Sequence, residues 1–218
     1  MDIVFSVFSP HPPILLPSIG SQKDRNKVKK TIQSLESLGK KFKKINPDLI
    51  IISSPHPDWG FNVPLFFLAN EFKSEVKPYL VGLEPPDFYF KKGKEFYQTQ
   101  ILNCKMKIGL IASGDLSHCL KKDGPYGFNP QGPKFDKALI ESLKRKDISA
   151  ILKLNDDFPE AGECGLRSFC FTLGILEAHS THSINSVQAS SGLKWEPEIL
   201  SYEGPFGVGY LVVNFKLK

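Results

Sequence analysis

The most regular feature of this sequence is a set of short apolar runs, each closed by serine or proline. Four branched apolar residues stand together at Leu49–Ile52, directly after Pro47 and Asp48. An unbroken run of this kind is typical of a strand that is buried on both faces of a parallel sheet. Comparable runs occur at 3–8 and 108–112, and a histidine follows each of the three runs within a few residues. If these strands are parallel neighbours, the three imidazoles lie at one edge of the sheet, where open α/β sheets bind ligands.

A helical pattern separates the first two strands. Residues 22–45 repeat apolar side chains at helical spacing and carry lysines on the remaining positions. Strand, helix and strand in this order form a βαβ unit, which predicts a right-handed crossover and parallel strands. The sequence therefore favours an α/β fold.

The remaining pattern extends this fold. We expect residues 60–64 to form a loop, and 63–72 fit a strand and a helix equally well. A short strand and a turn are expected at 77–86. Further strands are expected at about 107–112, 184–190, 198–201 and 208–215, and helices at about 89–103, 133–145, 147–154 and 164–179. We interpret residues 1–218 as a single domain with a central, mostly parallel or mixed sheet and helices on both faces.

Composition narrows the classes of partner. The formal charge of +5 comes almost entirely from lysine, because the chain has only three arginines, Arg25, Arg145 and Arg167. Nucleic-acid readers rely on arginine forks and aromatic platforms, so no nucleic-acid partner is expected. The four cysteines form no CxxC pair, which argues against a disulfide framework and favours the cytoplasm. With no signal peptide and no apolar run of membrane-spanning length, no membrane partner is expected, and a homo-oligomer is left open.

Two histidines share an unusual setting. His11 stands between Pro10 and Pro12, and His56 stands between Pro55 and Pro57. Proline on both sides removes backbone freedom and neighbouring N–H donors, so each imidazole is presented rigidly. The recurrence of this arrangement at two strand ends predicts that both histidines are metal ligands. Two histidines and one carboxylate with open positions suit Fe(II) oxygenases, whereas the same side chains can also hold Zn(II).

A third histidine follows the strand at 108–112. Asp115 and His118 are three residues apart, so a helical turn brings them to one side. A carboxylate beside a histidine is the usual way to orient a general base. His118 is therefore a candidate base or a third ligand, with Asp115 as its partner.

The segment around residue 163 offers further candidates. Glu163 and Cys164 stand between glycines at the start of a predicted helix, and both are candidate metal ligands. Fe(II) prefers the harder carboxylate, which favours Glu163. Arg167 follows closely, and its fork suits a carboxylate on a substrate or in the wall of the pocket. The Gly- and Pro-rich loop at 119–132 is expected to line the same pocket, with Tyr126 or Phe128 facing a ligand.

These motifs together resemble the LigB-like family of class III extradiol ring-cleavage dioxygenases, and within it the AmmeMemoRadiSam group with its Memo-like proteins. The matching stretches span nearly the whole chain: SPHPPILLPSIG (9–20), ISSPHPDWG (52–60), ASGDLSH (112–118), GPYGFNPQGPKFD (124–136), AGECGLRS (161–168) and SYEGPFGVGY (201–210).

The resemblance implies specific roles. In the dioxygenases two histidines that match His11 and His56 hold Fe(II), and a histidine that matches His118 acts as acid and base. The third ligand is a late glutamate, for which Glu163 is the candidate, whereas Memo-like proteins carry a cysteine that matches Cys164. The implied reaction opens the ring of a small catechol-like aromatic substrate with O₂. A Memo-like metal-binding protein that acts through partners, and a zinc hydrolase, are the alternatives.

Overall fold

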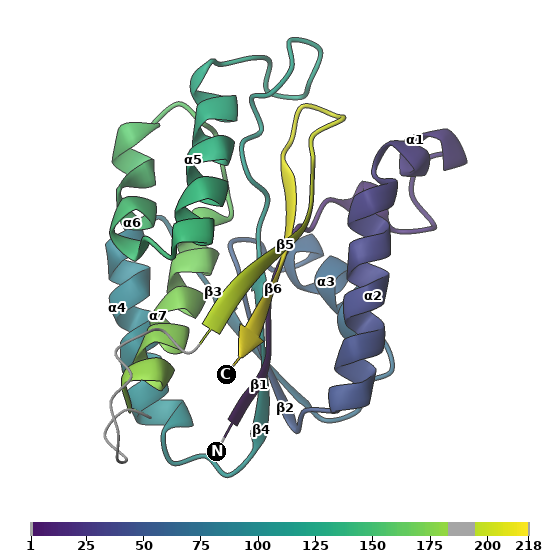
Figure 1. Cartoon of the computed structure of the whole chain (residues 1–218). Coiled ribbons are helices and arrows are strands. Elements are labelled where there is room, and N and C mark those ends of the chain that lie inside the picture. The colour runs from purple at the N-terminus through teal and green to yellow at the C-terminus, as the bar shows by residue number, and fades with distance from the viewer. Residues whose placement is uncertain (1, 183–194, 218) are drawn as a thin grey trace.

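A six-stranded sheet runs through the molecule in the order β3-β2-β4-β1-β6-β5 (Figure 1). The computed structural model describes residues 2–182 and 195–217. Four strands, β3, β2, β4 and β1, are parallel, and β6 and β5 continue the sheet as an antiparallel pair. The strands are β1 (Asp2–Ser9), β2 (Leu49–Ser54), β3 (Glu75–Leu80), β4 (Lys107–Ser113), β5 (Trp195–Glu203) and β6 (Tyr210–Leu217). The predicted α/β fold with a mixed sheet is confirmed.

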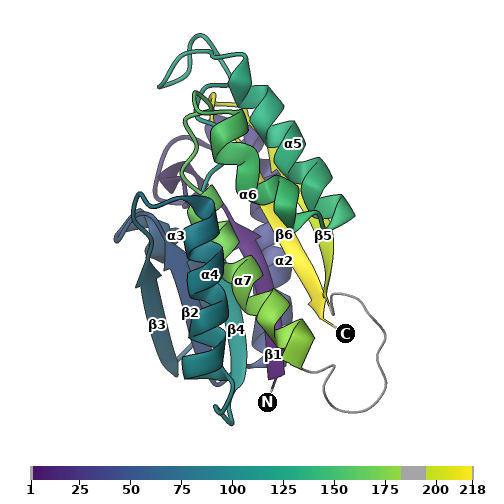
Figure 2. The same ribbon diagram turned by 90° about the vertical axis from the view of Figure 1, so that its left-hand side faces the viewer.

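Helices cover both faces of this sheet. In Figures 1 and 2, α4, α5, α6 and α7 lie over one face, and α2 and α3 lie over the other. The helices are α1 (Gln22–Lys27), α2 (Lys29–Ile45), α3 (Trp59–Ala69), α4 (Pro86–Phe96), α5 (Gln131–Arg145), α6 (Ile148–Asp157) and α7 (Leu166–His182), with a 3₁₀ turn at Pro13–Leu15 and a π turn at Tyr97–Ile101. None of the helices in the described ranges is long and apolar enough to span a membrane.

The apolar run of β2 shows why the strand needs branched residues at every position. Leu49 and Ile51 belong to the core under α4 to α7, whereas Ile50 and Ile52 belong to the core under α2 and α3. Successive side chains of a strand point to opposite faces, so a central strand covered on both sides is apolar throughout. All four side chains are buried, as the sequence predicted.

The predicted elements largely coincide with the observed ones. The expected helix at 22–45 is divided at Val28 into α1 and α2, and residues 63–69 of the ambiguous stretch belong to a helix. The short strand expected within 77–86, before a turn, is β3, which begins at Glu75 and ends at Leu80. The expected strand at 184–190 lies outside the described residues.

One expectation was wrong: residues 60–64 are not a loop but part of helix α3. Pro64 lies inside this helix and has no N–H to donate to the carbonyl of Gly60, four residues earlier. That carbonyl instead accepts a hydrogen bond from the hydroxyl of Ser113 at the end of β4. The helix tolerates its proline because a distant side chain replaces the missing donor.

The order of the strands determines where the candidate functional site lies. β4 lies between β2 and β1, and all three strands are parallel, so their carboxyl ends meet at one edge of the sheet. The segments that follow these three strands carry His56, His118 and His11. This edge is where the candidate site forms.

Candidate metal centre

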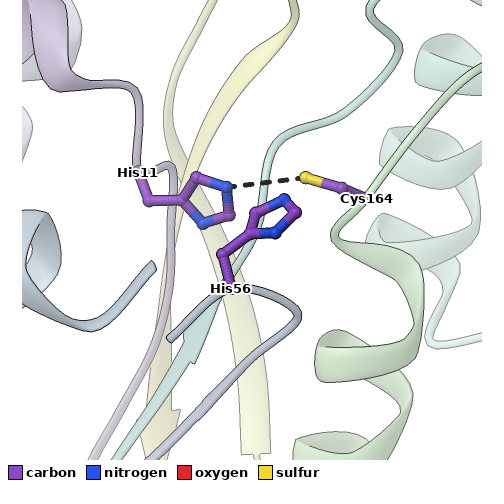
Figure 3. A group of neighbouring side chains, drawn as sticks. All are labelled: His11, His56 and Cys164. Atoms are coloured by element: carbon purple, nitrogen blue, oxygen red, sulfur yellow. Dashed lines mark hydrogen bonds between the residues drawn. The ribbon is translucent and has the colours of Figure 1, made fainter. Parts of the chain in front are cut away.

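Three strand ends deliver side chains to one point. His11 follows Ser9 of β1 by two residues, and Asp115 follows Ser113 of β4 by the same number. His56 follows the end of β2 in the same way. Figure 3 shows His11, His56 and Cys164 converging, with the cysteine arriving from the segment before α7. Four segments that are far apart in the sequence therefore meet here.

The spacing of the donor atoms suits one ion. One ligand atom each of His11, His56 and Cys164 lies within 4.8 Å of the other two. His11 Nε2 lies 3.6 Å from Cys164 Sγ, and the two imidazole ring centres are 5.2 Å apart. Nitrogen and sulfur bound to one tetrahedral ion at roughly 2.1 and 2.3 Å are about 3.6 Å apart. The His11–Cys164 separation, here a hydrogen bond to sulfur, is therefore also compatible with two atoms on a shared metal.

Ser113 fixes the orientation of His11. Its hydroxyl hydrogen points to the Gly60 carbonyl, so its oxygen is left to accept from His11 Nδ1, 2.9 Å away. This network assigns the proton of a neutral His11 to Nδ1 and leaves the lone pair of Nε2 directed at Cys164. Burial, together with the neighbouring charge of His56, lowers the pKa of His11 to about 3, so the ring is neutral near pH 7. A neutral imidazole with a second hydrogen-bonded nitrogen is the usual form of a metal-binding histidine.

Asp115 ties the centre together. Its Oδ1 accepts the backbone N–H of His11 at 3.0 Å, and its own N–H donates to Cys164 Sγ at 3.3 Å. Its carbonyl accepts from Gly165 N at 2.9 Å. The side chain is buried, and burial raises the pKa of this carboxyl to about 6. Asp115 thus holds the His11 backbone and the Cys164 segment in fixed relation.

The environment of Cys164 disfavours the thiolate form of its side chain. Burial, with a contribution from the charge of Asp115, raises the pKa of Cys164 well above its ordinary value. The thiolate form therefore needs a cation beside it, because a buried anion without a partner is strongly disfavoured. A divalent metal between Cys164 and the two histidines supplies such a cation.

His118 lies beside this group. It forms a second cluster with Asp115 and Cys164, whose ligand atoms also lie within 4.8 Å of one another. Its Nε2 is buried and has no hydrogen-bond partner. Burial lowers the pKa of His118, which keeps the ring neutral. A neutral, unpartnered imidazole nitrogen can accept a proton or bind an ion, so both of the roles predicted for His118 remain open.

Glu163 does not lie in either cluster. Its Oε2 accepts from Leu166 N at 2.6 Å, and its Oε1 pairs with Arg167 Nη1 at 3.2 Å. The carboxylate therefore bonds the start of α7 and Arg167, while the thiol of the adjacent Cys164 lies in the cluster with the two histidines. The thiol of Cys164, the alternative third ligand, is therefore the side chain that lies with the two histidines. These contacts do not support the preference for Glu163.

Arg167 adopts one of the two expected arrangements, a pair with a nearby acid. Besides Glu163, its guanidinium contacts the Glu84 carbonyl at 2.9 Å and Asn155 Oδ1 at 3.2 Å. All three nitrogens are thereby engaged by the protein. A direct contact of Arg167 with a substrate remains a prediction that these contacts do not favour.

The two candidate aromatic residues differ in position. The ring of Tyr126 lies against His118, with ring centres 5.1 Å apart, and it is largely exposed. Phe128 pairs with Leu120 through a short β-bridge across the loop and makes no described contact with the histidines. Of the two, Tyr126 is placed to offer a face to a ligand, and its substrate role stays a prediction.

Sequence reasoning missed two residues that hold the site. Ser113 was noted only as part of the ASGDLSH motif after a strand, and its partner Gly60 is 53 residues away. Asp136 of α5 is buried, and its carboxylate accepts from Ser117 N at 2.8 Å and from the Tyr202 hydroxyl at 2.6 Å. It therefore anchors the backbone directly before His118. A lone acid within an amphipathic helix gave no signal for this role.

Comparison with known proteins identifies the family. Residues 57–213 match the model of the catalytic LigB subunit of aromatic ring-opening dioxygenase. The chain belongs to the LigB family. The matched part contains His118 and Cys164 and begins one residue after His56.

Two individual relatives were compared. The chain is 28% identical to Protein CA_C1420 of Clostridium acetobutylicum, over 95% of this chain and 56% of that protein. It therefore spans about half the length of this curated relative. The crystal structure of the uncharacterized protein JW3007 from Escherichia coli K12 superposes with a TM-score of 0.60 at 13% identity, covering 96% of this chain and 98% of that one. At this identity the likeness concerns the fold.

Proposed function

We propose that this LigB-family chain is a metal-dependent dioxygenase of the extradiol type, which opens the ring of a catechol-like substrate with O₂. The observation that carries the proposal is the convergence of His11, His56 and Cys164 beside a buried, unpartnered His118. Both oxygen atoms of O₂ enter the ring-opened product, so the reaction needs no external reductant. Fe(II) is the metal that this activity requires, and Zn(II) is the alternative occupant, which thiolate ligation by Cys164 favours.

The proposed ligands are His11, His56 and Cys164. A bound divalent metal would supply Lewis acidity and would bring the diol and O₂ to adjacent positions. His56 is exposed while His11 is buried, so solvent and substrate approach from the side of His56. Three protein ligands leave coordination positions free for substrate on this open side.

The remaining side chains act on the substrate. His118 Nε2 is the proposed acceptor of a hydroxyl proton from the diol, because it is neutral, buried and without a partner. Asp115 accepts the backbone N–H of His11 through its carboxylate and that of Cys164 through its carbonyl, and so connects both segments. The exposed ring of Tyr126 beside His118 offers a flat apolar face to an aromatic ring.

A second candidate is a Memo-like metal-binding protein that acts through partners without ring cleavage. One observation favours it: the anionic side chain in the cluster is a thiol, while the Glu163 carboxylate is engaged elsewhere. Thiolate ligation favours softer ions than the two-histidine, one-carboxylate set of the Fe(II) oxygenases. The two candidates share one metal site and differ in turnover.

Turnover of catechols separates these candidates. Protein loaded anaerobically with Fe(II) is mixed with a panel of catechols and O₂, and oxygen uptake and ring-opened product are followed together. Dioxygenase activity predicts one O₂ consumed per product and loss of turnover in His118→Ala with the metal content retained. Stoichiometric metal binding without turnover of any catechol would favour the second candidate. The variants His11→Ala and His56→Ala test the metal site itself, since each should lose metal and stay folded.

A further inference from the structure

Two adjacent residues, Glu163 and Cys164, offer anionic side chains of different chemistry, and the structure sends them in different directions. Cys164 Sγ lies 3.6 Å from His11 Nε2. The Glu163 carboxylate instead borders a separate polar cavity of about 210 Å³, lined among others by Asn155 and Arg167. The identity of the third ligand therefore depends on what keeps Glu163 in place.

Arg167 and the backbone N–H of Leu166 together restrain the Glu163 carboxylate. The two side chains form an ion pair at 3.2 Å, with side-chain exposures of 18% for Arg167 and 8% for Glu163. Arg167 is itself fixed from two other segments, by the Glu84 carbonyl and by Asn155 Oδ1. An ion pair this buried is costly to break, because either charge left alone has lost both water and partner.

The short segment that carries Glu163 also carries the thiol of Cys164, which lies beside His11. Gly162 precedes Glu163 with a φ of +63°, and Gly165 follows Cys164, so the short segment between them is flanked by residues without side chains. Without Arg167 the buried carboxylate keeps the N–H of Leu166 but lacks a countercharge, which the proposed metal at the two histidines would supply. Glu163 and Cys164 then compete for one coordination position.

We propose that Arg167 determines the metal preference of this centre, by holding Glu163 away so that the thiolate of Cys164 is the third ligand. This inference rests on the proposed metal site at His11, His56 and Cys164. Carboxylate beside two imidazoles suits Fe(II), and thiolate in the same position shifts the preference toward softer ions such as Zn(II). Arg167 touches neither metal nor substrate and acts through Glu163, so it is a positioning residue.

Cobalt substitution gives a readout that does not depend on activity. A thiolate bound to Co(II) produces a near-ultraviolet charge-transfer band, whereas carboxylate and imidazole do not. The Co(II) band should be present in the wild type and in Glu163→Gln, and absent in Cys164→Ser. In Arg167→Gln the band should lose most of its intensity, and the ratio of Zn(II) to Fe(II) affinity should fall by roughly tenfold.

The double variant Glu163→Gln with Arg167→Gln is the decisive control. If Arg167 acts only by restraining Glu163, removing the carboxylate as well should restore the wild-type band and metal preference. Arg167→Lys keeps the buried charge and thus protects the fold, yet one ammonium cannot serve all three acceptors of the guanidinium. Arg167→Lys should therefore show a smaller loss of the Co(II) band, and a smaller fall in the Zn(II)-to-Fe(II) affinity ratio, than Arg167→Gln. Circular dichroism and thermal unfolding verify that each variant is folded.

The outcomes separate this inference from the metal site on which it rests. A wild-type protein that binds Co(II) without a thiolate band overturns the ligand set and the inference together. A wild-type band that persists unchanged in folded Arg167→Gln, or in Arg167→Lys where the Gln variant does not fold, overturns the role of Arg167 alone. A double variant that fails to recover the band also overturns it, because the effect then does not pass through Glu163.

Discussion

The hydroxyl of Ser113 lies 2.9 Å from His11 Nδ1 and bonds at the same time to the carbonyl of Gly60. That carbonyl is free because Pro64, one helical turn later, has no N–H. The proline in α3 therefore has a consequence at the metal site. The free carbonyl accepts a hydrogen bond from the hydroxyl of Ser113. The oxygen of Ser113 in turn accepts from His11 Nδ1, which keeps His11 in the tautomer that can bind a metal.

Replacing Ser113 by Ala should weaken metal binding about 10- to 100-fold, the usual effect of removing a partner of a ligating histidine. His11 Nδ1 and the Gly60 carbonyl both lose their partner in this variant. The dissociation constant is measured by competition with a chelator. Ser53→Ala is the matched control, since Ser53 is buried on the neighbouring strand β2 and bonds Ser168 instead of a histidine. Equal affinities in the two variants would contradict the role of Ser113.

Metal binding should release about one proton from Cys164. Burial raises the pKa of this thiol well above its ordinary value, so the proton is present in the free protein and is displaced by the ion. His11 contributes none, because burial lowers its pKa to about 3. The apparent affinity should therefore rise by up to about tenfold per pH unit between pH 7 and 9.

Titration calorimetry in buffers of different ionisation enthalpy counts this proton directly. Cys164→Ser should bind more weakly and release about one proton fewer per metal ion, which flattens the pH dependence. Cys104→Ser, which changes a free cysteine outside both clusters, should leave the count unchanged. An unaltered count in Cys164→Ser would exclude the thiolate as ligand.

Much of the fold and part of the site could be predicted from local sequence. The apolar run at Leu49–Ile52 specifies burial on both faces without reference to the rest of the chain. The parallel order of β1, β2 and β4 then brings the histidines that follow them to one edge, which explains why His11, His56 and His118 were found from strand ends alone.

What local sequence could not decide depends on long-range contacts. The sequence favoured Glu163 over Cys164 as the third ligand. In the structure the Glu163 carboxylate bonds Leu166 N and Arg167, and Arg167 also bonds Asn155 and Glu84. In the helix at 60–64, the donor to the Gly60 carbonyl is likewise distant, since it is the hydroxyl of Ser113, 53 residues away. Local sequence marks proline as a helix breaker and does not reveal a distant donor that compensates for its missing N–H.

Tyr126 should contribute to the binding of an aromatic substrate. Its ring lies beside His118 and is largely exposed, so Tyr126→Ala should raise KM several-fold and change the free energy of unfolding by less than about 0.5 kcal/mol. Tyr126→Phe keeps the apolar face and should retain the wild-type KM. Steady-state kinetics on the best catechol of the panel measures both. Phe128→Ala is the comparison, and a larger KM effect there than in Tyr126→Ala would reverse the assignment.

Asp136 should make the protein less stable as the pH rises through the range from about 4 to about 7. Burial raises the pKa of this carboxyl from 3.8 to about 7, against the opposing hydrogen bonds from Tyr202 and Ser117. Between these two values the folded state binds more protons than the unfolded state, and stability falls with rising pH wherever that holds.

Asp136→Asn removes the titration and can keep both hydrogen bonds through its amide. Its free energy of unfolding should therefore lose this part of the pH dependence, which chemical denaturation at several pH values measures. Glu141→Gln on the exposed side of the same helix should keep the wild-type slope, and a wild-type slope in Asp136→Asn as well would show that Asp136 is ionised in the folded protein throughout this range.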